Sequence, residues 1–257
     1  MIKNIFVVGS GKGGVGKSTI SVNLAIAMAK KKLNIGLLDA DIYGPSIPKM
    51  LGITSKPEIS KNKKILPYDK YDIKSISIAN MIPDNSAVIW RGAMASSAIR
   101  QLYNDVDWGE LDYLIIDLPP GTGDIQLSIS QNFSILGAVV VSTPQQISLI
   151  DVRKSINMFK KVNVPILGLI QNMSYLELDG KKNYLFGKNG VLDECKNNNL
   201  NFLGEVPLIP SVTEACDIGV PIFFNKNCND AKSFEKISEN ILESLKRTKT
   251  REVKIET

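Results

Sequence analysis

The stretch from Lys3 to Thr19, KNIFVVGSGKGGVGKST, constrains the fold more than any other part of the chain. The apolar, β-branched run at residues 5–8 predicts a buried strand, and a helical pattern follows the glycines. Between them, Gly11, four residues, Gly16 and Lys17 have the spacing of a phosphate-binding loop. The backbone N–H groups of such a loop and the N-terminus of its helix surround phosphate oxygens. The sequence therefore predicts a strand, loop and helix that bind phosphate groups.

The residue types of this loop each have a chemical reason. Gly13, Gly14 and Gly16 are expected to take positive φ angles, so that the main chain can approach phosphate oxygens. Lys17 is expected to place its ammonium on the β- and γ-phosphates, and the hydroxyl of Ser18 to ligate Mg²⁺. A turn that merely joins a strand to a helix is the alternative, which the complete spacing disfavours. We predict a nucleotide site formed by Gly11, Lys12, Gly13, Gly14, Val15, Gly16, Lys17, Ser18 and Thr19.

Two further predicted strands end in carboxylates. An apolar stretch after the first helix is followed by Asp39 and Asp41, and the later stretch LDYLIID ends in Asp117. The carboxyl ends of parallel strands lie at one edge of an open α/β sheet, where such sheets bind ligands. Asp117 has the place of the Walker B carboxylate, which holds Mg²⁺ directly or through water. The LPPGTGD turn is expected to bring the N–H of Gly121 or Gly123 close to a γ-phosphate.

The remaining sequence adds strand and helix units. Strands are expected at 135–142 and 165–171, with a helix at 147–161 between them. A final helix at about 230–247 carries an apolar stripe that we expect to pack in the core. We interpret the polar, lysine-rich residues 54–72 as a surface excursion. The predicted fold class is α/β, a mostly parallel doubly wound sheet with helices on both faces, and with the phosphate-binding loop it resembles P-loop NTPases of the SIMIBI type.

Composition fits one folded unit, which we predict to span residues 1–257 with 248–257 as a flexible tail. Hydrophobic residues make up 44% and charged residues 22%, as in ordinary globular proteins. The net charge of +5 comes from mostly interleaved basic and acidic residues, and the basic runs at 61–64 and 246–251 are interpreted as solvated surface. We therefore expect no nucleic-acid partner.

The chain contains no histidine, which excludes a His general base, a Ser–His–Asp triad and a His-ligated zinc site. Its three cysteines, Cys195, Cys216 and Cys228, are widely separated, so we expect a reducing compartment instead of a disulfide framework. The longest apolar run, 135–141, is far shorter than the ~20 residues of a membrane helix, and no signal peptide precedes the first strand. We expect a cytoplasmic protein without membrane contact.

A second loop lysine, Lys12, makes GKGGVGKST the deviant form of the phosphate-binding loop. This form resembles the family of dimeric ATPases that includes MinD, ParA, the nitrogenase iron protein and the Mrp/ApbC iron–sulfur carriers. The resemblance implies a homodimer in which Lys12 crosses to the partner's nucleotide and stabilises charge on the transferring phosphate. Lys12 and Lys17 would then be catalytic residues of an ATPase. A solvated loop lysine is the alternative.

The match extends over most of the chain through the strings DADIYGPSIPKMLG, WRGAM, IIDLPPGTGD, TPQQISLIDVRKSINMF and QNMSY. Together they resemble the Mrp/ApbC carriers, which include NUBPL-like relatives of mitochondrial complex I assembly. Ala93 replaces the usual proline of their WRGPM motif; Trp90 and Arg91 could equally be packing and surface residues. The resemblance implies a Mg²⁺-dependent ATPase that carries or assembles iron–sulfur clusters for apo recipient proteins.

The same resemblance assigns roles at the nucleotide. It implies that Asp41 orients or deprotonates the attacking water and that Asp39 lies near Mg²⁺, unless one of the two only caps the next turn. It also implies that Asn172 reads adenine with its side-chain amide, a turn-forming Asn being the alternative. Pro207, in VPLIPSVTEA, would line the base on its other side. Within that segment, Ser211 has capping-box spacing for the following helix.

The resemblance fails at one functional feature. The carriers place a C-x-x-C pair shortly after NMSY, where two subunits together supply four thiolates, but NMSYLELDGKKNYLFG contains no cysteine. Cys195, Cys216 and Cys228 could replace the pair, although buried cysteine is more often a small apolar residue. Two other functions therefore stay open. One is a MinD-like or ParA-like positioning ATPase, and the other is a regulatory ATPase without a metal cluster.

Overall fold

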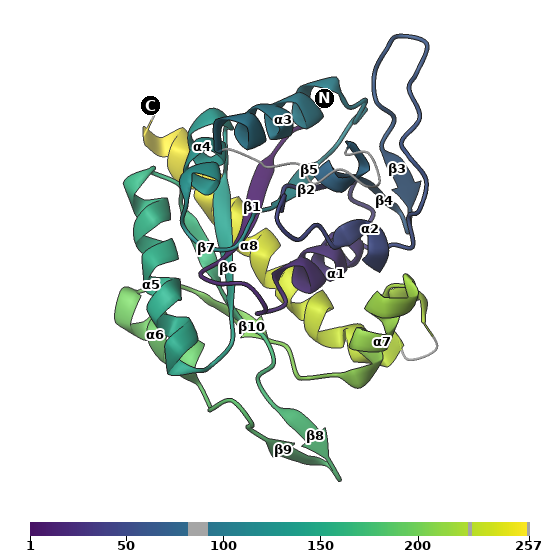
Figure 1. Ribbon diagram of the computed structural model, residues 1–257. Coiled ribbons are helices and arrows are strands. Elements are labelled where there is room, and N and C mark those ends of the chain that lie inside the picture. Colours follow the sequence, from purple (N-terminus) through teal and green to yellow (C-terminus); the bar gives the residue numbers. More distant parts are fainter. Residues whose placement is uncertain (82–91, 226–227, 256–257) are drawn as a thin grey trace.

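A sheet of eight strands forms the centre of the protein in the computed structural model, which describes residues 1–81, 92–225 and 228–255 (Figure 1). Its strands are β1 (Ile5–Ser10), β2 (Ile35–Asp39), β3 (Tyr68–Lys70), β4 (Ile73–Ser77), β5 (Tyr113–Asp117), β6 (Gly137–Ser142), β7 (Ile166–Gln171) and β10 (Phe202–Glu205). They lie in the order β10-β7-β6-β1-β5-β2-β4-β3. All neighbours are parallel except β3, which runs antiparallel to β4. The central strands are buried along their whole length because helices cover both faces.

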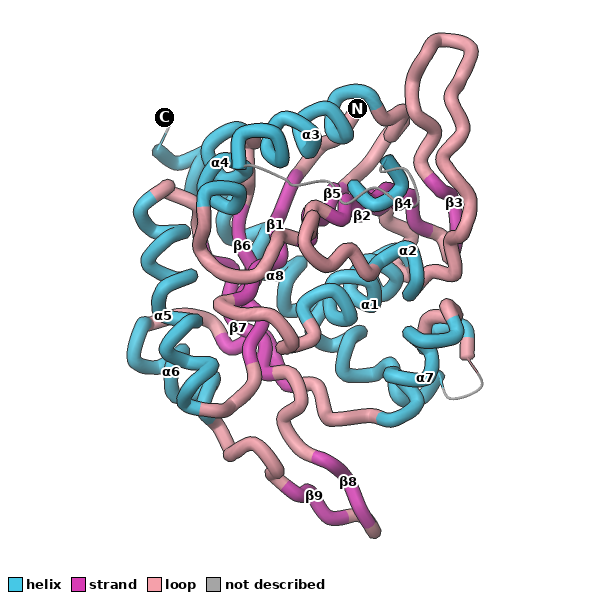
Figure 2. The backbone as a smooth tube through the Cα atoms, in the orientation of Figure 1, coloured by secondary structure: helices cyan, strands magenta, loops and turns pink. Residues whose placement is uncertain are grey.

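Helices form a layer on each face of this sheet (Figure 2). They are α1 (Lys17–Ala29), α2 (Ile47–Met50), α3 (Gly92–Asp105), α4 (Asp124–Asn132), α5 (Gln146–Lys161), α6 (Gly190–Asn198), α7 (Pro210–Ile218) and α8 (Lys232–Ile255), with the 3₁₀ turns η1 (Ile78–Met81), η2 (Ile222–Phe224) and η3 (Cys228–Ala231). Along β1, Phe6 and Val8 pack on the side of α1, α7 and α8. Ile5 and Val7 pack on the side of α3 to α6. This alternation confirms the predicted doubly wound α/β class.

The strand order changes direction at β1, and this change determines where the site lies. The chain leaves β1, passes through α1 and continues in β2, and β5 later pairs between β1 and β2. In this register Asp117 pairs with Val8 on one side and with Asp39 on the other. Open α/β sheets bind ligands at such a switch point, beyond the carboxyl ends of the strands. The phosphate-binding loop and two predicted acids therefore lie at one edge of the sheet.

Several helix boundaries differ from those predicted. The sequence predicts a first helix over about residues 17–32, but α1 ends at Ala29, and the lysines that follow form a turn in which Lys32 has a φ angle of 62°. The last helix continues to Ile255, so residues 248–255 are helical; the flexibility predicted for that tail stays a prediction. Ser211 is not an N-cap, because α7 begins at Pro210 and the Ser211 hydroxyl donates to Asp230 instead.

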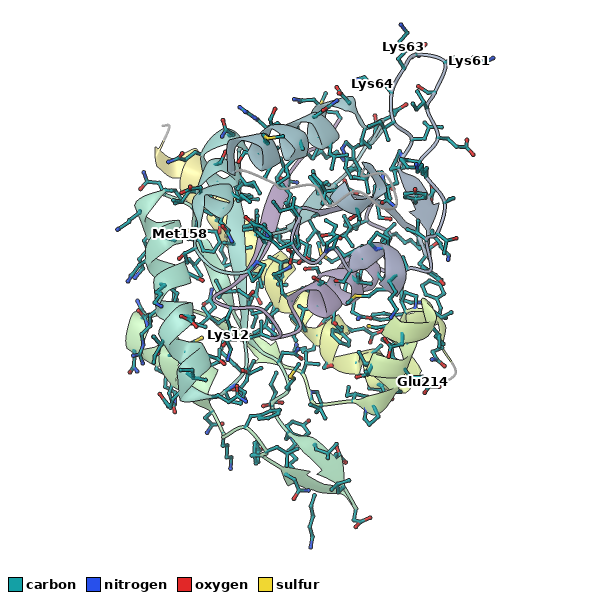
Figure 3. The ribbon with its side chains drawn as sticks, viewed as in Figure 1. Lys12, Lys61, Lys63, Lys64, Met158 and Glu214 are labelled. Atoms are coloured by element: carbon teal, nitrogen blue, oxygen red, sulfur yellow. The ribbon has the colours of Figure 1, made fainter. Side chains whose placement is uncertain are left out.

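The predicted surface excursion is an extended arm before β3. Lys61, Lys63 and Lys64 lie at its tip, far from the loop that carries Lys12 (Figure 3). The motif residues Trp90 and Arg91 lie outside the described residues, and α3 begins directly after them. None of the helices that the structure describes is long and apolar enough to cross a lipid bilayer.

Candidate nucleotide-binding site

The loop between β1 and α1 takes the conformation that its glycines permit. Gly14 and Gly16 have φ angles of 78° and 80°, in the left-handed region that glycine adopts without strain. Gly13 was expected to share this conformation, but its φ angle is not positive. Gly11 is required by packing instead, since a Cβ atom there would lie 2.4 Å from the backbone carbonyl carbon of Asp151 in α5. The loop is thus pressed against α5 and turned at two glycines.

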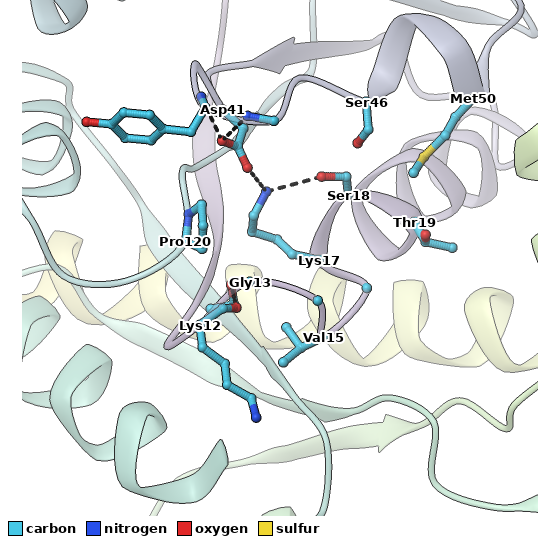
Figure 4. A pocket seen from close by; sticks show the side chains of 15 residues that line it. Lys12, Gly13, Val15, Lys17, Ser18, Thr19, Asp41, Ser46, Met50 and Pro120 are labelled. Atoms are coloured by element: carbon cyan, nitrogen blue, oxygen red, sulfur yellow. Dashed lines mark hydrogen bonds and ion pairs between the residues drawn. The ribbon is translucent and has the colours of Figure 1, made fainter. Parts of the chain in front are cut away.

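Lys17, Ser18 and Asp117 form the centre of the site. The Nζ atom of Lys17 donates a hydrogen bond of 2.7 Å to Oδ2 of Asp117, and Oγ of Ser18 donates one of 2.6 Å to the same oxygen. Asp41 approaches from the loop after β2, with Oδ2 at 3.5 Å from Lys17 Nζ (Figure 4). Lys17 is only 6% exposed and Asp117 is completely buried. The predicted phosphate-loop and strand-end residues therefore meet in one buried cluster.

Asp39 adds a third acid to this cluster. Burial, and after it the charge of Asp117, raises the pKa of Asp39 from 3.8 to about 7. The pKa of Lys17 is also raised, because the three carboxylates outweigh burial, which by itself lowers that pKa. One buried lysine thus faces three carboxyl groups. Such an excess of acidic groups favours a divalent cation at this place.

The two carboxylate oxygens of Asp41 make different contacts. Its Oδ1 accepts the N–H groups of Tyr43 at 3.3 Å and Gly44 at 3.2 Å, which fixes the turn after β2. Its Oδ2 faces Lys17. The two interpretations left open for Asp41, a turn cap and a residue of the phosphate site, are therefore compatible. Asp39 supports the same turn, since its Oδ1 accepts the N–H of Asp41 at 3.1 Å.

Two buried serines that the sequence reasoning missed hold the carboxylates in place. Ser21 Oγ lies 2.6 Å from Oδ1 of Asp117, the oxygen that Lys17 does not contact. Ser77, the last residue of β4, donates at 2.9 Å to Oδ2 of Asp39. A signal existed for each. Ser21 lies one helical turn after Lys17 and hence on the same face of α1, and β4 ends beside β2.

Lys12 and the turn after Asp117 lie at the mouth of the site. The side chain of Lys12 extends away from Lys17, and Pro120 lines the cavity close to Gly13 (Figure 4). The N–H of Gly121 donates to the carbonyl of Ser10 at 2.9 Å, so it is not directed at a phosphate as one alternative expected. The other alternative, Gly123, directly precedes α4.

Two adjoining cavities surround the loop. The first, of about 410 Å³, is lined by the phosphate-binding loop, Asp41 and Pro120. The second, of about 150 Å³, is lined by Asn172, Pro207 and Cys216, and both cavities share Gly16 and Thr19. The residues predicted to contact the base therefore lie directly beside those predicted to contact the phosphates.

Cys216 stands against the loop in the second cavity. Burial raises the pKa of its thiol, while a hydrogen bond with the side chain of Thr19 acts in the opposite direction. The thiol is therefore protonated near neutral pH, because the ordinary value of 9.0 is already above it. We interpret Cys216 as part of the cavity wall.

The residues at the loop suit Mg²⁺ even though they do not enclose it. Within the described residues, no group of three or more Asp, Glu, Cys or His side chains is arranged to hold a metal ion by itself. Mg²⁺ is usually held by one or two carboxylates together with nucleotide phosphates and water, not by a cage of protein ligands. Ser18, Asp39 and Asp117 match that donor set: a hydroxyl and carboxyl groups beside a phosphate-binding loop.

Residues 173–187, where the resemblance places a cysteine pair, contain a hairpin of β8 (Leu176–Leu178) and β9 (Lys181–Asn183). The two turn residues, Asp179 and Gly180, have φ angles of 51° and 70°, as in a type I′ turn. The hairpin projects from the body of the protein (Figure 1). The short polar strands gave no clear alternation, so the sequence reasoning missed them.

The fold and the loop geometry define this chain as a P-loop NTPase. Residues 1–242 match the family model described as "ParA: NUBPL iron-transfer P-loop NTPase", and the chain belongs to this family. The resemblance drawn from the sequence motifs is thereby confirmed. The iron-sulfur cluster transfer protein NUBPL of Mus musculus is 47% identical over 250 residues, which cover 95% of this chain and 78% of that protein.

Solved structures agree with this assignment. A nucleotide-binding protein from Archaeoglobus fulgidus, solved with ADP, has a TM-score of 0.75 and 37% identity, covering 85% of this chain and 87% of its own. The septum site-determining protein MinD of Pyrococcus horikoshii, solved with Mg-ADP, has a TM-score of 0.69 over 94% of this chain and 96% of its own. At 22% identity, the likeness to MinD shows the fold alone.

Proposed function

We propose that this chain binds Mg·ATP and hydrolyses it as part of an iron–sulfur cluster carrier or assembly cycle. One observation carries the nucleotide part: the ammonium of Lys17 and the hydroxyl of Ser18 meet the Walker B carboxylate of Asp117 at 2.7 and 2.6 Å beside the loop cavity. These groups are the cation, the hydroxyl and the acid that a P-loop NTPase requires.

The proposed roles follow from where each group lies. Lys17 neutralises the β- and γ-phosphates, and Asp41, whose Oδ2 lies 3.5 Å from Lys17 Nζ, orients the attacking water. Ser18, Asp39 and Asp117 would hold Mg²⁺, which would withdraw charge from the phosphate oxygens. Each role uses a side chain that is buried or lines the cavity.

We further propose that hydrolysis takes place in a homodimer that sandwiches the nucleotides. The direction of Lys12 supports this proposal, because its side chain leads away from the Lys17 of its own site (Figure 4). A lysine so placed is available to a phosphate held by a second copy, where it would act like an arginine finger.

The cargo of this proposal is inferred from the family. The relatives are named for transfer or carriage of iron–sulfur clusters, and we propose apo recipient proteins as partners of this chain too. The hairpin segment 173–187 does not fit a cluster, since it contains no cysteine. A regulatory ATPase without a cluster is therefore the second candidate. We also propose a cytoplasmic location, because the widely separated cysteines are typical of a reducing compartment.

The purified protein tests the nucleotide part directly. Fluorescent ATP should bind in the presence of Mg²⁺, and phosphate release should stop when EDTA removes the metal. Lys17→Ala should weaken ATP binding by about a hundredfold, because the phosphates lose a buried charged donor. Lys12→Ala should leave binding intact and slow phosphate release by a factor of about 10³. Equal loss of binding in both variants would remove the case for a lysine that acts across an interface.

A further inference from the structure

Asn172 is tied to the phosphate-binding loop as well as to the second cavity. It follows β7, and its backbone N–H donates to the carbonyl of Ser142 at 2.8 Å. Its side chain is only 6% exposed, and Nδ2 donates a hydrogen bond of 2.8 Å to the carbonyl of Val15, 157 residues earlier in the chain. Asn172 is therefore fixed both at its backbone and at its side-chain amide.

The carbonyl that Asn172 binds lies at the turning point of the loop. Val15 stands between Gly14 and Gly16, which both have left-handed backbones. A Cβ atom on Gly16 would lie 2.2 Å from Nδ2 of Asn172, so the main chain passes the amide more closely than any other residue type would allow. The hydrogen bond thus fixes the orientation of the peptide group that joins Val15 to Gly16.

This peptide orientation matters for phosphate binding. The loop binds anions through backbone N–H groups, which point inward only while the carbonyls between them point outward. A buried carbonyl without a hydrogen-bond donor costs free energy. Removal of the Asn172 side-chain amide should therefore favour rotation of the Val15–Gly16 peptide group. Thr19 and Gly16 line both cavities, so the contact lies where the proposed phosphate and base sites meet.

We propose that Asn172 is a positioning residue for the phosphate-binding loop and not only a residue that contacts the base. The inference rests on the proposed nucleotide site and deepens it. A base reader acts only on ligands that have a base. A residue that holds the Val15 carbonyl acts on any polyphosphate, including one with neither base nor ribose.

The test uses inorganic tripolyphosphate with Mg²⁺ as a base-free probe, measured by displacement of fluorescent ATP. We expect Asn172→Ala to weaken tripolyphosphate and ATP alike, by about tenfold, as for one buried hydrogen bond. Asn172→Asp keeps the size but replaces the donor by an acceptor, and should weaken both at least as much. Pro207→Ala is the matched control: it changes the same cavity without a contact to Val15, so it should weaken ATP and leave tripolyphosphate unchanged.

A second comparison, between two nucleotides that bind the same variant, separates loss of base reading from a general loss of binding. Inosine triphosphate lacks the exocyclic amine of adenine, so the ratio of its affinity to that of ATP measures base reading alone. We expect Asn172→Ala, shown to be folded by a cooperative thermal transition, to lower both affinities together with that for tripolyphosphate, and any change in their ratio to report the base contact alone. Tripolyphosphate binding equal to that of the parent protein, or loss of the ATP preference alone, overturns the inference. If the parent protein binds no ATP, the proposed function fails first and the inference fails with it.

Discussion

Ser21 positions the carboxylate of Asp117, which we propose to hold Mg²⁺. Its single proton can go to Oδ1 of Asp117 at 2.6 Å or to the carbonyl of Lys17 at 3.1 Å, and the shorter contact to a carboxylate is the stronger. Ser21→Ala should therefore raise the Mg²⁺ concentration for half-maximal ATPase activity by about tenfold or more. Ser155→Ala, which removes a buried serine that bonds its own helix in α5, should leave that concentration unchanged. Equal effects of the two variants would contradict a role at the metal.

The pKa of Asp39 makes stability depend on pH in a defined direction. The carboxyl group has a pKa of 3.8 in the unfolded chain and about 7 in the folded one, so the folded state binds its proton more tightly. Its contribution to the free energy of unfolding is complete below about pH 4 and is lost as the pH rises to about 7.

Asp39→Asn does not titrate, which makes the pH effect measurable. We expect the stability of the variant relative to the parent protein to increase between about pH 5 and about pH 8, in urea unfolding without Mg²⁺. The stability of the parent protein alone does not isolate Asp39, because other carboxyl groups also titrate in this range. A difference that stays constant over this range would show that Asp39 is ionised throughout.

At the scale of elements, the contact between the phosphate-binding loop and α5 gives a matched pair of substitutions. Gly11→Ala would drive a methyl group into the backbone of Asp151, with the nearest atom at 2.4 Å. We expect a loss of about 1–3 kcal/mol in the free energy of unfolding, as for other overpacked sites. Gly13→Ala meets only Pro120, at 4.0 Å, and should unfold like the parent protein. Chemical denaturation of both variants without nucleotide measures the difference.

The elements that the sequence predicted well are those with a strong local signal. The loop, β1, β2, β5, β6 and β7 were all expected because long buried strands are continuous apolar runs. The hairpin of β8 and β9 was missed because its strands have three residues each and depend on the Asp179–Gly180 turn. The capping box at Ser211 was wrong for a tertiary reason: the hydroxyl binds Asp230, which the local pattern cannot reveal.

The same division holds for the candidate site. Lys17 and Ser18 were predicted from the loop spacing, and Asp39, Asp41 and Asp117 were placed beside them because parallel topology brings the strand ends to one edge. The residues that hold these groups in position could not be predicted from the sequence. The serine that holds Asp117 and the amide that holds the phosphate-binding loop act through contacts fixed only by the three-dimensional packing.

At the scale of the whole molecule, the proposed dimer makes a quantitative mixing prediction. Lys12→Ala and Asp41→Ala should each be nearly inactive, but in a mixed dimer one site combines the intact Asp41 of one subunit with the intact Lys12 of the other. Half of randomly formed dimers are mixed and each has one active site of two, so about a quarter of the parent activity should return. Phosphate release from unfolded and refolded mixtures measures it, and no recovery would point to a lysine that acts within its own subunit.

The chain's thiols determine what can be expected of the cluster. A cluster needs several thiolates held together. Cys195, a residue of α6, is buried in the core, and burial raises its pKa to about 12. Cys216 is in the wall of the second cavity, on the opposite side of the sheet. These two thiols are therefore protonated and face different cores, while the hairpin at residues 173–187 supplies none.

Reconstitution with iron and sulfide under anaerobic conditions should accordingly give weak, substoichiometric cluster binding, measured by iron and sulfide analysis of the desalted protein. Replacement of Cys195, Cys216 and Cys228 by Ser should leave ATPase activity unchanged, because none of the proposed catalytic or metal-binding groups is a cysteine. A stable stoichiometric cluster that is lost when any two of these cysteines are replaced would reverse this expectation. It would mean that two subunits bring the relocated thiols together, since two cysteines from each chain supply the four thiolates that a cluster requires.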